Sequence, residues 1–205
     1  MENWINRPVV LHGKTVDLLP LEEAHFDALH RVARDKRIWE FYPGDWSVRE
    51  TFERVHRGTL AHRENGVEYP FVVVHKAAQE IVGSTRLMDL APRDKRLEIG
   101  GTWYKPAYWA TAVNTDCKLA LLTFAFETMN AHRVQLKTQH NNIRSRKAIE
   151  KIGGVFEGII REHMLKDDGS FRSSAYFSIL EQEWPSVKAK LESMLAEKTR
   201  GVHTY

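Results

Sequence analysis

The residues best suited to chemistry open a predicted helix near residue 114. The segment Ala110-Thr111-Ala112-Val113-Asn114-Thr115 is small and polar, and an apolar stretch follows it. The first N–H groups of a helix lack backbone partners, and the helix dipole favours negative charge at that end. Side-chain donors from Thr111, Asn114 and Thr115 add to these groups. The segment is therefore a candidate phosphate site, although the same side chains could simply cap the helix.

Basic side chains elsewhere could complete such an anion site. Lys105, Arg144, Arg146 and Lys147 lie in segments that could supply cations. The pattern is not a Walker A loop, since no Gly-Lys-Ser/Thr follows, and it is not the dinucleotide motif G-x-G-x-x-G. If a phosphate-bearing ligand binds here, it is held by neither of these two motifs.

Other kinds of chemistry find no support in the residue pattern. His25 and His30 are five positions apart and His56 and His62 are six apart, so neither pair has the His-x-x-x-His spacing of a metal-binding helix. We expect no metal. Cys117 falls within the predicted helix, where packing in the core is favoured over nucleophilic catalysis. No Gly-x-Ser-x-Gly elbow supports a serine hydrolase.

The composition excludes several classes of protein. The chain has 205 residues, of which 42% are hydrophobic and 28% charged, with a formal charge of +3. No run of five Lys or Arg residues occurs, so we expect no nucleic-acid partner. A single cysteine fits a reducing cytoplasm. No apolar run approaches 18 residues and the start, MENWINRPVV, lacks signal-peptide features, so we expect a cytoplasmic protein without a membrane segment.

The elements that must position these residues alternate between strands and helices. Strands are predicted at 9–19, 69–75, 80–90, 96–104, 132–138, 155–165 and 171–180, and helices at 21–34, 47–63, 114–130, 142–151 and 185–198. In the first strand, His12-Gly13 is a possible kink or turn. Ser47 and Glu50 form a capping-box pattern before the second helix, and Gly153 suits a left-handed cap after the fourth. The order indicates an α+β (mixed α/β) fold, with one antiparallel-rich sheet carrying helices on its faces.

An aromatic segment, residues 38–46, joins the first two predicted helices. It contains Trp39, Tyr42 and Trp46, and it is punctuated by Pro43 and Gly44. The segment could be a lid over a ligand or a packed loop. The chain shows no repeat, low-complexity stretch or linker, so residues 1–205 are expected to form a single domain.

The second half of the chain carries a family resemblance. Residues 140–153 read His-Asn-Asn-Ile-Arg-Ser-Arg-Lys-Ala-Ile-Glu-Lys-Ile-Gly. They resemble the Asn-x-x-Ser/Ala…Glu-Lys-Leu-Gly segment of the GNAT superfamily of N-acetyltransferases. Residues 109–114 stand where that superfamily has its acetyl-CoA motif, roughly Gln/Arg-x-x-Gly-x-Gly/Ala. Together with Glu-Ile-Gly…Trp-x-x-Pro and Glu-Gly-x-x-Arg (Glu157, Gly158, Arg161), these motifs resemble the branch that includes ribosomal-protein N-terminal acetyltransferases. The resemblance covers about residues 8–184, with the helix 185–198 after it.

The resemblance implies transfer of an acetyl group from acetyl-CoA to a primary amine by direct attack. It implies that strands 98–104 and 132–138 splay apart to admit the pantetheine arm, and that the loop 109–115 wraps the pyrophosphate. Asn142 would bond the arm, and Ser145 would lie near the thioester sulfur. The cofactor-binding residues carried over by position are Thr102, Trp103, Tyr104, Trp109, Ala110, Thr111, Ala112, Val113, Asn114, Thr115, Asn142, Ser145 and Arg146.

The sequence departs from the family pattern in the cofactor loop. Trp109 replaces the usual Gln or Arg, Ala112 the usual Gly, and Asn114 the usual Gly or Ala. A methyl group at Ala112 is compatible with the loop unless φ is positive there. Because of these departures, the alternative is a non-catalytic CoA-binding or interaction protein on the same fold.

The catalytic residues are implied less directly. Many family members carry a Tyr acid where Ser145 lies, and a Glu base near the position of Lys137. We expect Glu98 to be the base, acting through water, because it lies on the strand that faces the cofactor gap. Glu162 and His163 are the next candidates, and an imidazole with its ordinary pKa near 6.5 could accept a proton directly.

The acceptor amine must be neutral before it can attack a thioester. At pH 7, deprotonation costs about 1 kcal/mol for an α-amine and about 4.6 kcal/mol for a lysine-type amine. A site with a poor base therefore suits a protein N-terminus or a small amine of low pKa. We expect Trp39, Tyr42, Trp46 and Glu162 to contact the acceptor, and we expect a monomer or homodimer.

Overall fold

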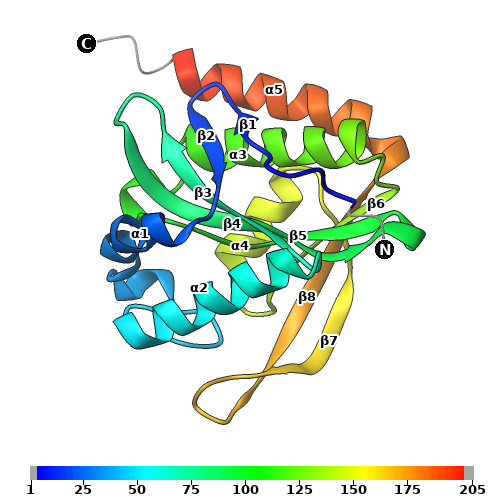
Figure 1. Cartoon of the computed structure of the whole chain (residues 1–205). Helices are drawn as coiled ribbons and strands as arrows, with labels where there is room; N and C mark the ends of the chain where they lie inside the picture. The colour runs from blue at the N-terminus through cyan, green and yellow to red at the C-terminus, as the bar shows by residue number, and fades with distance from the viewer. Residues whose placement is uncertain (1–3, 201–205) are drawn as a thin grey trace.

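Eight strands form one sheet in the computed structural model, which describes residues 4–200 (Figure 1). Their spatial order is β1-β2-β3-β4-β5-β6-β8-β7. Neighbouring strands are antiparallel except β5 and β6, which are parallel. The bounds are Leu11–His12 (β1), Val16–Pro20 (β2), Tyr69–His75 (β3), Glu80–Ala91 (β4), Arg96–Tyr104 (β5), Arg133–Gln139 (β6), Val155–Leu165 (β7) and Phe171–Leu180 (β8).

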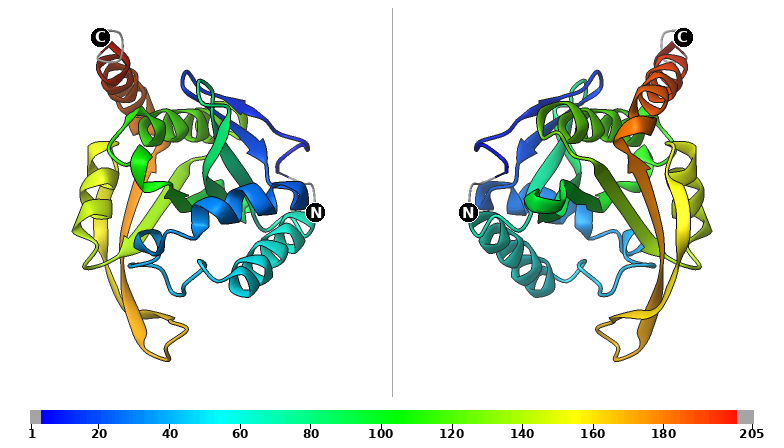
Figure 2. Two further views of the ribbon diagram at one scale, coloured as in Figure 1. Left: turned by 90° about the vertical axis from the view of Figure 1, so that its left-hand side faces the viewer. Right: turned by 90° about the vertical axis from the view of Figure 1, so that its right-hand side faces the viewer.

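Helices cover both faces of this sheet, which confirms the predicted α+β class (Figures 1 and 2). The helices are Phe26–Ala33 (α1), Arg49–Glu64 (α2), Ala112–Thr123 (α3), Ile143–Lys151 (α4) and Trp184–Arg200 (α5). α3 and α5 pack together on one face, and α1 and α2 lie on the other. Within residues 4–200, no helix has the length and apolar character needed to cross a bilayer.

A glycine bulge in β5 changes which face its side chains meet. Leu97 and Ile99 belong to the apolar cluster of α3 and α5, whereas Trp103 belongs to the cluster of α1 and α2. A regular strand would keep all three on one face, because side chains alternate. Gly101 has a φ of +56°, and a Cβ there would lie 2.8 Å from the Nε of Arg86. The bulge requires glycine, and it turns Trp103 toward α1 and α2.

The two parallel strands separate soon after they meet. Residues 96–98 of β5 pair with residues 133–135 of β6, and no later residues of these two strands pair. The splay predicted between strands 98–104 and 132–138 is therefore present. Beyond Glu98, the β6-facing edge of β5 offers its backbone groups to whatever enters the gap.

Two local predictions were right only in part, and one was wrong. Residues 9–19, predicted as a strand with a possible turn at His12-Gly13, form the hairpin of β1 and β2. The carboxylate of Asp116 accepts N–H bonds from its turn at Lys14 and Thr15. The helix predicted at 114–130 begins at Ala112 and changes to a π-helical turn at Phe124–Thr128. The capping box of the second helix does not form, because Val48 is the N-cap.

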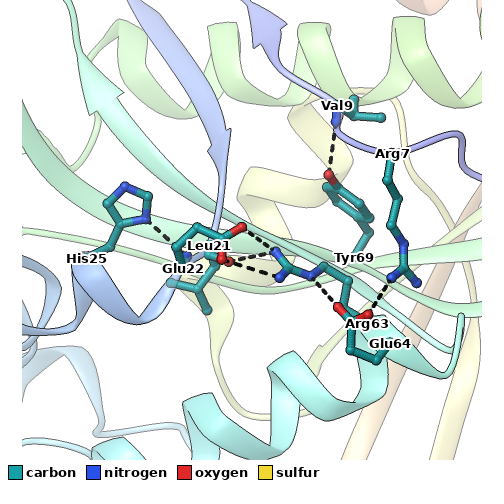
Figure 3. A network of polar contacts seen from close by, with 8 residues as sticks. All are labelled: Arg7, Val9, Leu21, Glu22, His25, Arg63, Glu64 and Tyr69. Carbon is teal, nitrogen blue, oxygen red and sulfur yellow. Dashed lines mark hydrogen bonds and ion pairs between the residues drawn. The ribbon is translucent and has the colours of Figure 1, made fainter.

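Polar contacts attach the end of α2 to the first strands (Figure 3). Arg63 donates to the carbonyl of Leu21 at 2.7 Å and to the carboxylate of Glu22 at 2.9 Å. Next to it, Glu64 accepts from Arg7 at 3.2 Å. These contacts hold the C-terminal end of α2 against the segments that flank β1 and β2.

Candidate functional site

A cavity of about 480 Å³ occupies the gap between β5 and β6. Its walls come from both strands, the loop after β5, the first turns of α3 and α4, and the aromatic segment 38–46. Many of the predicted site residues line it: Tyr42, Trp46, Glu98, Thr102, Trp103, Tyr104, Trp109, Ala110, Asn114, Asn142 and Ser145. Segments far apart in the sequence are thus brought to one space that passes between the two strands.

The other predicted site residues do not line the cavity: Trp39, Thr111, Ala112, Val113, Thr115, Arg146, Glu162 and His163. Trp39 is 5% exposed and donates to the carbonyl of Ala33 at 2.6 Å, so it supports the aromatic wall from behind. Arg146 donates to the carbonyl of His140 at 3.2 Å and lies over Phe156. Glu162 is exposed on a bulge of β7.

The start of α3 is capped and cationic. Thr111 is the N-cap, and its hydroxyl accepts the N–H of Val113 at 3.3 Å. The residue of the loop with a positive φ is Ala110, at +62°, and not Ala112. Lys198, from the C-terminal helix, donates to the carbonyl of Thr111 at 2.8 Å and to the hydroxyl of Thr115 at 3.2 Å. A cation thus stands beside the predicted phosphate loop, from a helix that the sequence did not connect with it.

A stacked pair spans the two sides of the gap. Trp109 follows β5 and Arg144 begins α4, and the guanidinium lies 4.0 Å from the ring centroid. The indole N–H of Trp109 donates to the carbonyl of Tyr104 at 3.0 Å, which holds the ring in place. Where the family pattern has Gln or Arg, this chain therefore has an aromatic platform that carries an arginine from the opposite wall.

Asn142 and Ser145 are coupled at the start of α4. The side-chain oxygen of Asn142 accepts the backbone N–H of Ser145 at 3.0 Å, so Asn142 is the helix N-cap. Asn142 is only 9% exposed, and both residues line the cavity. Because the oxygen is used for capping, the NH₂ group is what Asn142 can offer to a ligand.

Glu98 lies where the two strands part. It is 1% exposed, and its Oε2 accepts from the amide of Gln135 at 2.9 Å and from the ammonium of Lys137 at 3.0 Å. Burial opposes the charge of Lys137, but the carboxylate of Glu98 outweighs burial and raises the pKa of this lysine. The predicted base is thus half of a buried ion pair inside the cavity.

His163 lies outside the lining of the cavity. Its Nδ1 is 3.1 Å from the hydroxyl of Ser174, and its Nε2 is 3.1 Å from that of Tyr176. Burial lowers the pKa of His163, and Lys137 and Arg172 lower it further. The imidazole is therefore neutral at pH 7, but both its nitrogens already have partners.

Three buried cations of the cavity, Arg86, Lys118 and Arg172, were missed in the sequence. Lys118 is 6% exposed, its ammonium donates to the hydroxyl of Thr102 at 2.8 Å, and burial lowers its pKa to about 8. A signal existed, since Lys118 follows Asn114 by one helical turn and so shares its face. Arg172 had no such signal. Residues 4–200 contain no group of three His, Cys, Asp or Glu side chains placed to hold a metal ion.

Comparison with known proteins now decides the family. The model of the acetyltransferase (GNAT) domain matches residues 16–155. The chain belongs to the GNAT acetyltransferase family. This assignment agrees with the splayed strands and with the motifs at residues 109–114 and 142–153.

Individual relatives support the same assignment. "Putative ribosomal N-acetyltransferase YdaF" of Bacillus subtilis is 29% identical over 108 residues, which are 53% of this chain and 58% of YdaF. The chain thus spans little more than half the length of this relative. A GCN5-related N-acetyltransferase from Brucella melitensis is 27% identical with a TM-score of 0.81, over 95% of this chain and 90% of that one. RimJ of Mycobacterium smegmatis, solved with CoA-disulfide, shares the fold at 20% identity and a TM-score of 0.78, over 94% and 96% of the two chains.

Proposed function

We propose that the protein transfers an acetyl group from acetyl-CoA to a primary amine. The observation that carries the proposal is the cavity between β5 and β6, where the two strands no longer pair with each other. A pantetheine arm with amide groups can pair with such backbone. The relatives reported above carry acetyltransferase names, which supports the same activity.

The cofactor's phosphates are assigned to the start of α3. The segment 110–115 offers N–H groups at the positive end of a helix. Lys198 and Arg144 flank this end, and Lys118 lies one turn further along α3. The pantetheine arm would then run past the NH₂ group of Asn142 toward the ion pair of Glu98 and Lys137.

The acceptor is assigned to the other side of the sheet, where α1, α2 and the segment 38–46 lie. The neutral amine attacks the thioester carbon, so the C–N bond forms as the C–S bond breaks. Glu98 is proposed to receive the amine proton through water, and Ser145 to donate a proton to the leaving thiolate. The electron pair of the broken bond stays on sulfur until that proton arrives.

Thiol release from acetyl-CoA, measured with a panel of N-terminal peptides, amino acids and polyamines, tests the proposal. We expect amine-dependent release that saturates with acetyl-CoA. Calorimetric titration with CoA, done in parallel, separates binding from turnover. Tight CoA binding with no turnover across the panel would favour a non-catalytic CoA-binding protein. Absence of CoA binding would overturn both the acetyltransferase and the non-catalytic CoA-binding function.

A further inference from the structure

Arg172 is a buried cation for which residues 4–200 provide no carboxylate partner. It is 8% exposed and lines the cavity. One terminal nitrogen donates to the carbonyl of Phe41 at 3.2 Å, and the other lies 3.5 Å from the hydroxyl of Ser174. Its Nε is buried without any hydrogen-bond partner in the described part of the chain. Both of these acceptors are uncharged. Glu98 attracts the guanidinium from beyond ion-pair distance, but its carboxylate is already paired with Lys137.

The other buried arginine of the cavity shows what is missing. Arg86 is also 8% exposed, but it pairs with the carboxylate of Glu68 at 3.3 Å. An arginine cannot lose its charge at neutral pH, and burying a charge is costly unless it is paired. A guanidinium offers a planar fork that matches a carboxylate. The environment of Arg172 is therefore that of a site whose anion arrives with a ligand.

Arg172 lies at the acceptor end of the cavity. It is the second residue of β8, where it pairs with Met164 of β7, and its side chain reaches Phe41 in the segment before α2. The neighbouring ion pair of Glu98 and Lys137 is internally neutral. Arg172 thus has no carboxylate of its own among the described residues that line the cavity.

The charge balance of the whole cavity points the same way. Its charged lining residues are the cations Arg86, Lys118, Lys137, Arg144 and Arg172 and the single carboxylate Glu98. Arg86 and Lys137 are already paired with carboxylates. Lys118 and Arg144 lie on the side assigned to the cofactor phosphates. Arg172 is therefore the cavity cation that remains to attract an acceptor with negative charge. The uncharged wall at the acceptor end is largely apolar, with Ile38, Phe41, Trp46, Val55, Met88 and Met164.

We propose that the acceptor is a small amino-carboxylate with an apolar side chain, and that Arg172 binds its carboxylate. The inference rests on the proposed acetyl transfer and specifies its substrate class. The amine of the acceptor would face Glu98, and its carboxylate would balance the positive charge of Arg172. Its apolar side chain would lie against the aromatic segment 38–46.

Matched acceptors test this in the intact protein. Thiol release is measured with phenylalanine, phenylalaninamide and spermidine at one ionic strength. A hydrogen bond to a charged group contributes about 1.5–3 kcal/mol, so Arg172→Met should lower the acid-to-amide ratio of kcat/KM by about 10- to 150-fold. Comparing this ratio between wild type and variant cancels the different pKa values of the two amines. Arg172→Lys should restore part of the ratio, and the exposed Arg161 of β7 supplies the control Arg161→Met, which should leave it unchanged.

A binding measurement keeps the inference testable when turnover fails. N-acetylphenylalanine and its amide are titrated into the protein–CoA complex by calorimetry. We expect the wild type to bind the acid at least tenfold more tightly, and Arg172→Met to lose this preference while its circular dichroism is unchanged. Equal binding of acid and amide by wild type would overturn the inference even if amines are acetylated. Preferred turnover of spermidine, or an acid preference that persists in Arg172→Met, would overturn it too.

Discussion

Lys118 is expected to make the free energy of unfolding depend on pH in the alkaline range. Its ammonium group lies inside the cavity beside Thr102, and burial lowers its pKa from 10.5 to about 8. In the unfolded chain the ordinary value returns, so between pH 8 and 10.5 the unfolded state binds more protons than the folded one. Stability therefore rises with pH across this window. At about 1.4 kcal/mol for each pH unit, the full effect is about 3 kcal/mol.

Lys118→Met removes this titration while keeping an unbranched side chain. At pH 7 the variant escapes the cost of the buried charge but loses the bond to Thr102, which contributes about 1 kcal/mol, so it should be more stable than wild type by about 2 kcal/mol. Urea unfolding of both proteins from pH 7 to 10.5 should show the variant's advantage falling by about 3 kcal/mol. The exposed Lys190 of α5 supplies the control Lys190→Met. A pH-independent difference between wild type and Lys118→Met would refute the reasoning.

The same variant separates folding from function. The charge of Lys118 lowers stability, yet it lies on the route proposed for the cofactor, one turn beyond Asn114. Lys118→Met should therefore bind CoA more weakly although it unfolds less readily. Residues that raise activity at the expense of stability typically behave in this way.

Three further substitutions test the assignments of the site. Ala112→Asp places an acidic residue at the first turn of α3, where it stabilises a helix by about 0.3–1 kcal/mol, so the fold should persist while CoA affinity falls; unchanged affinity in calorimetry would move the phosphates elsewhere. Ser145→Ala should lower kcat by about 10²–10⁴ with little change in KM, and a loss below about threefold would make Ser145 a packing residue. Glu98→Gln should lower turnover, whereas full turnover, with an inflection below pH 6.5 that disappears in His163→Ala, would make His163 the base.

The helices and strands were predictable where the local sequence pattern agrees with the tertiary contacts. The strands Tyr69–His75, Arg96–Tyr104, Val155–Leu165 and Phe171–Leu180 have the predicted bounds, because β-branched and aromatic runs end there at turn residues. The cap at Ser47 failed because of one local and one non-local contact. Its N–H donates to Asp45 at 2.9 Å and its carbonyl lies 3.0 Å from Nε2 of His30, so the chain enters α2 one residue later.

The site was predictable only in outline. The resemblance of residues 109–114 and 140–153 to the family motifs implied the gap between β5 and β6, because in that family these two segments face a common cofactor. The bulge at Gly101 could not be seen, because it depends on the register with Arg86 of the neighbouring strand. Arg172 could not be assigned either, since it meets Phe41 from 131 positions away in the chain.

The position of Arg172 leads to a last prediction about its anion. Phosphates bound at the start of α3 would compensate Lys118, Arg144 and Lys198, which lie on that side of the gap. Arg172 contacts the segment before α2 on the opposite side, so the same phosphates do not balance its positive charge. Cofactor and carboxylate should therefore bind together: saturating CoA should leave the affinity for N-acetylphenylalanine unchanged or higher. Competition between the two in calorimetry, abolished in Arg172→Met, would show instead that this arginine serves the cofactor.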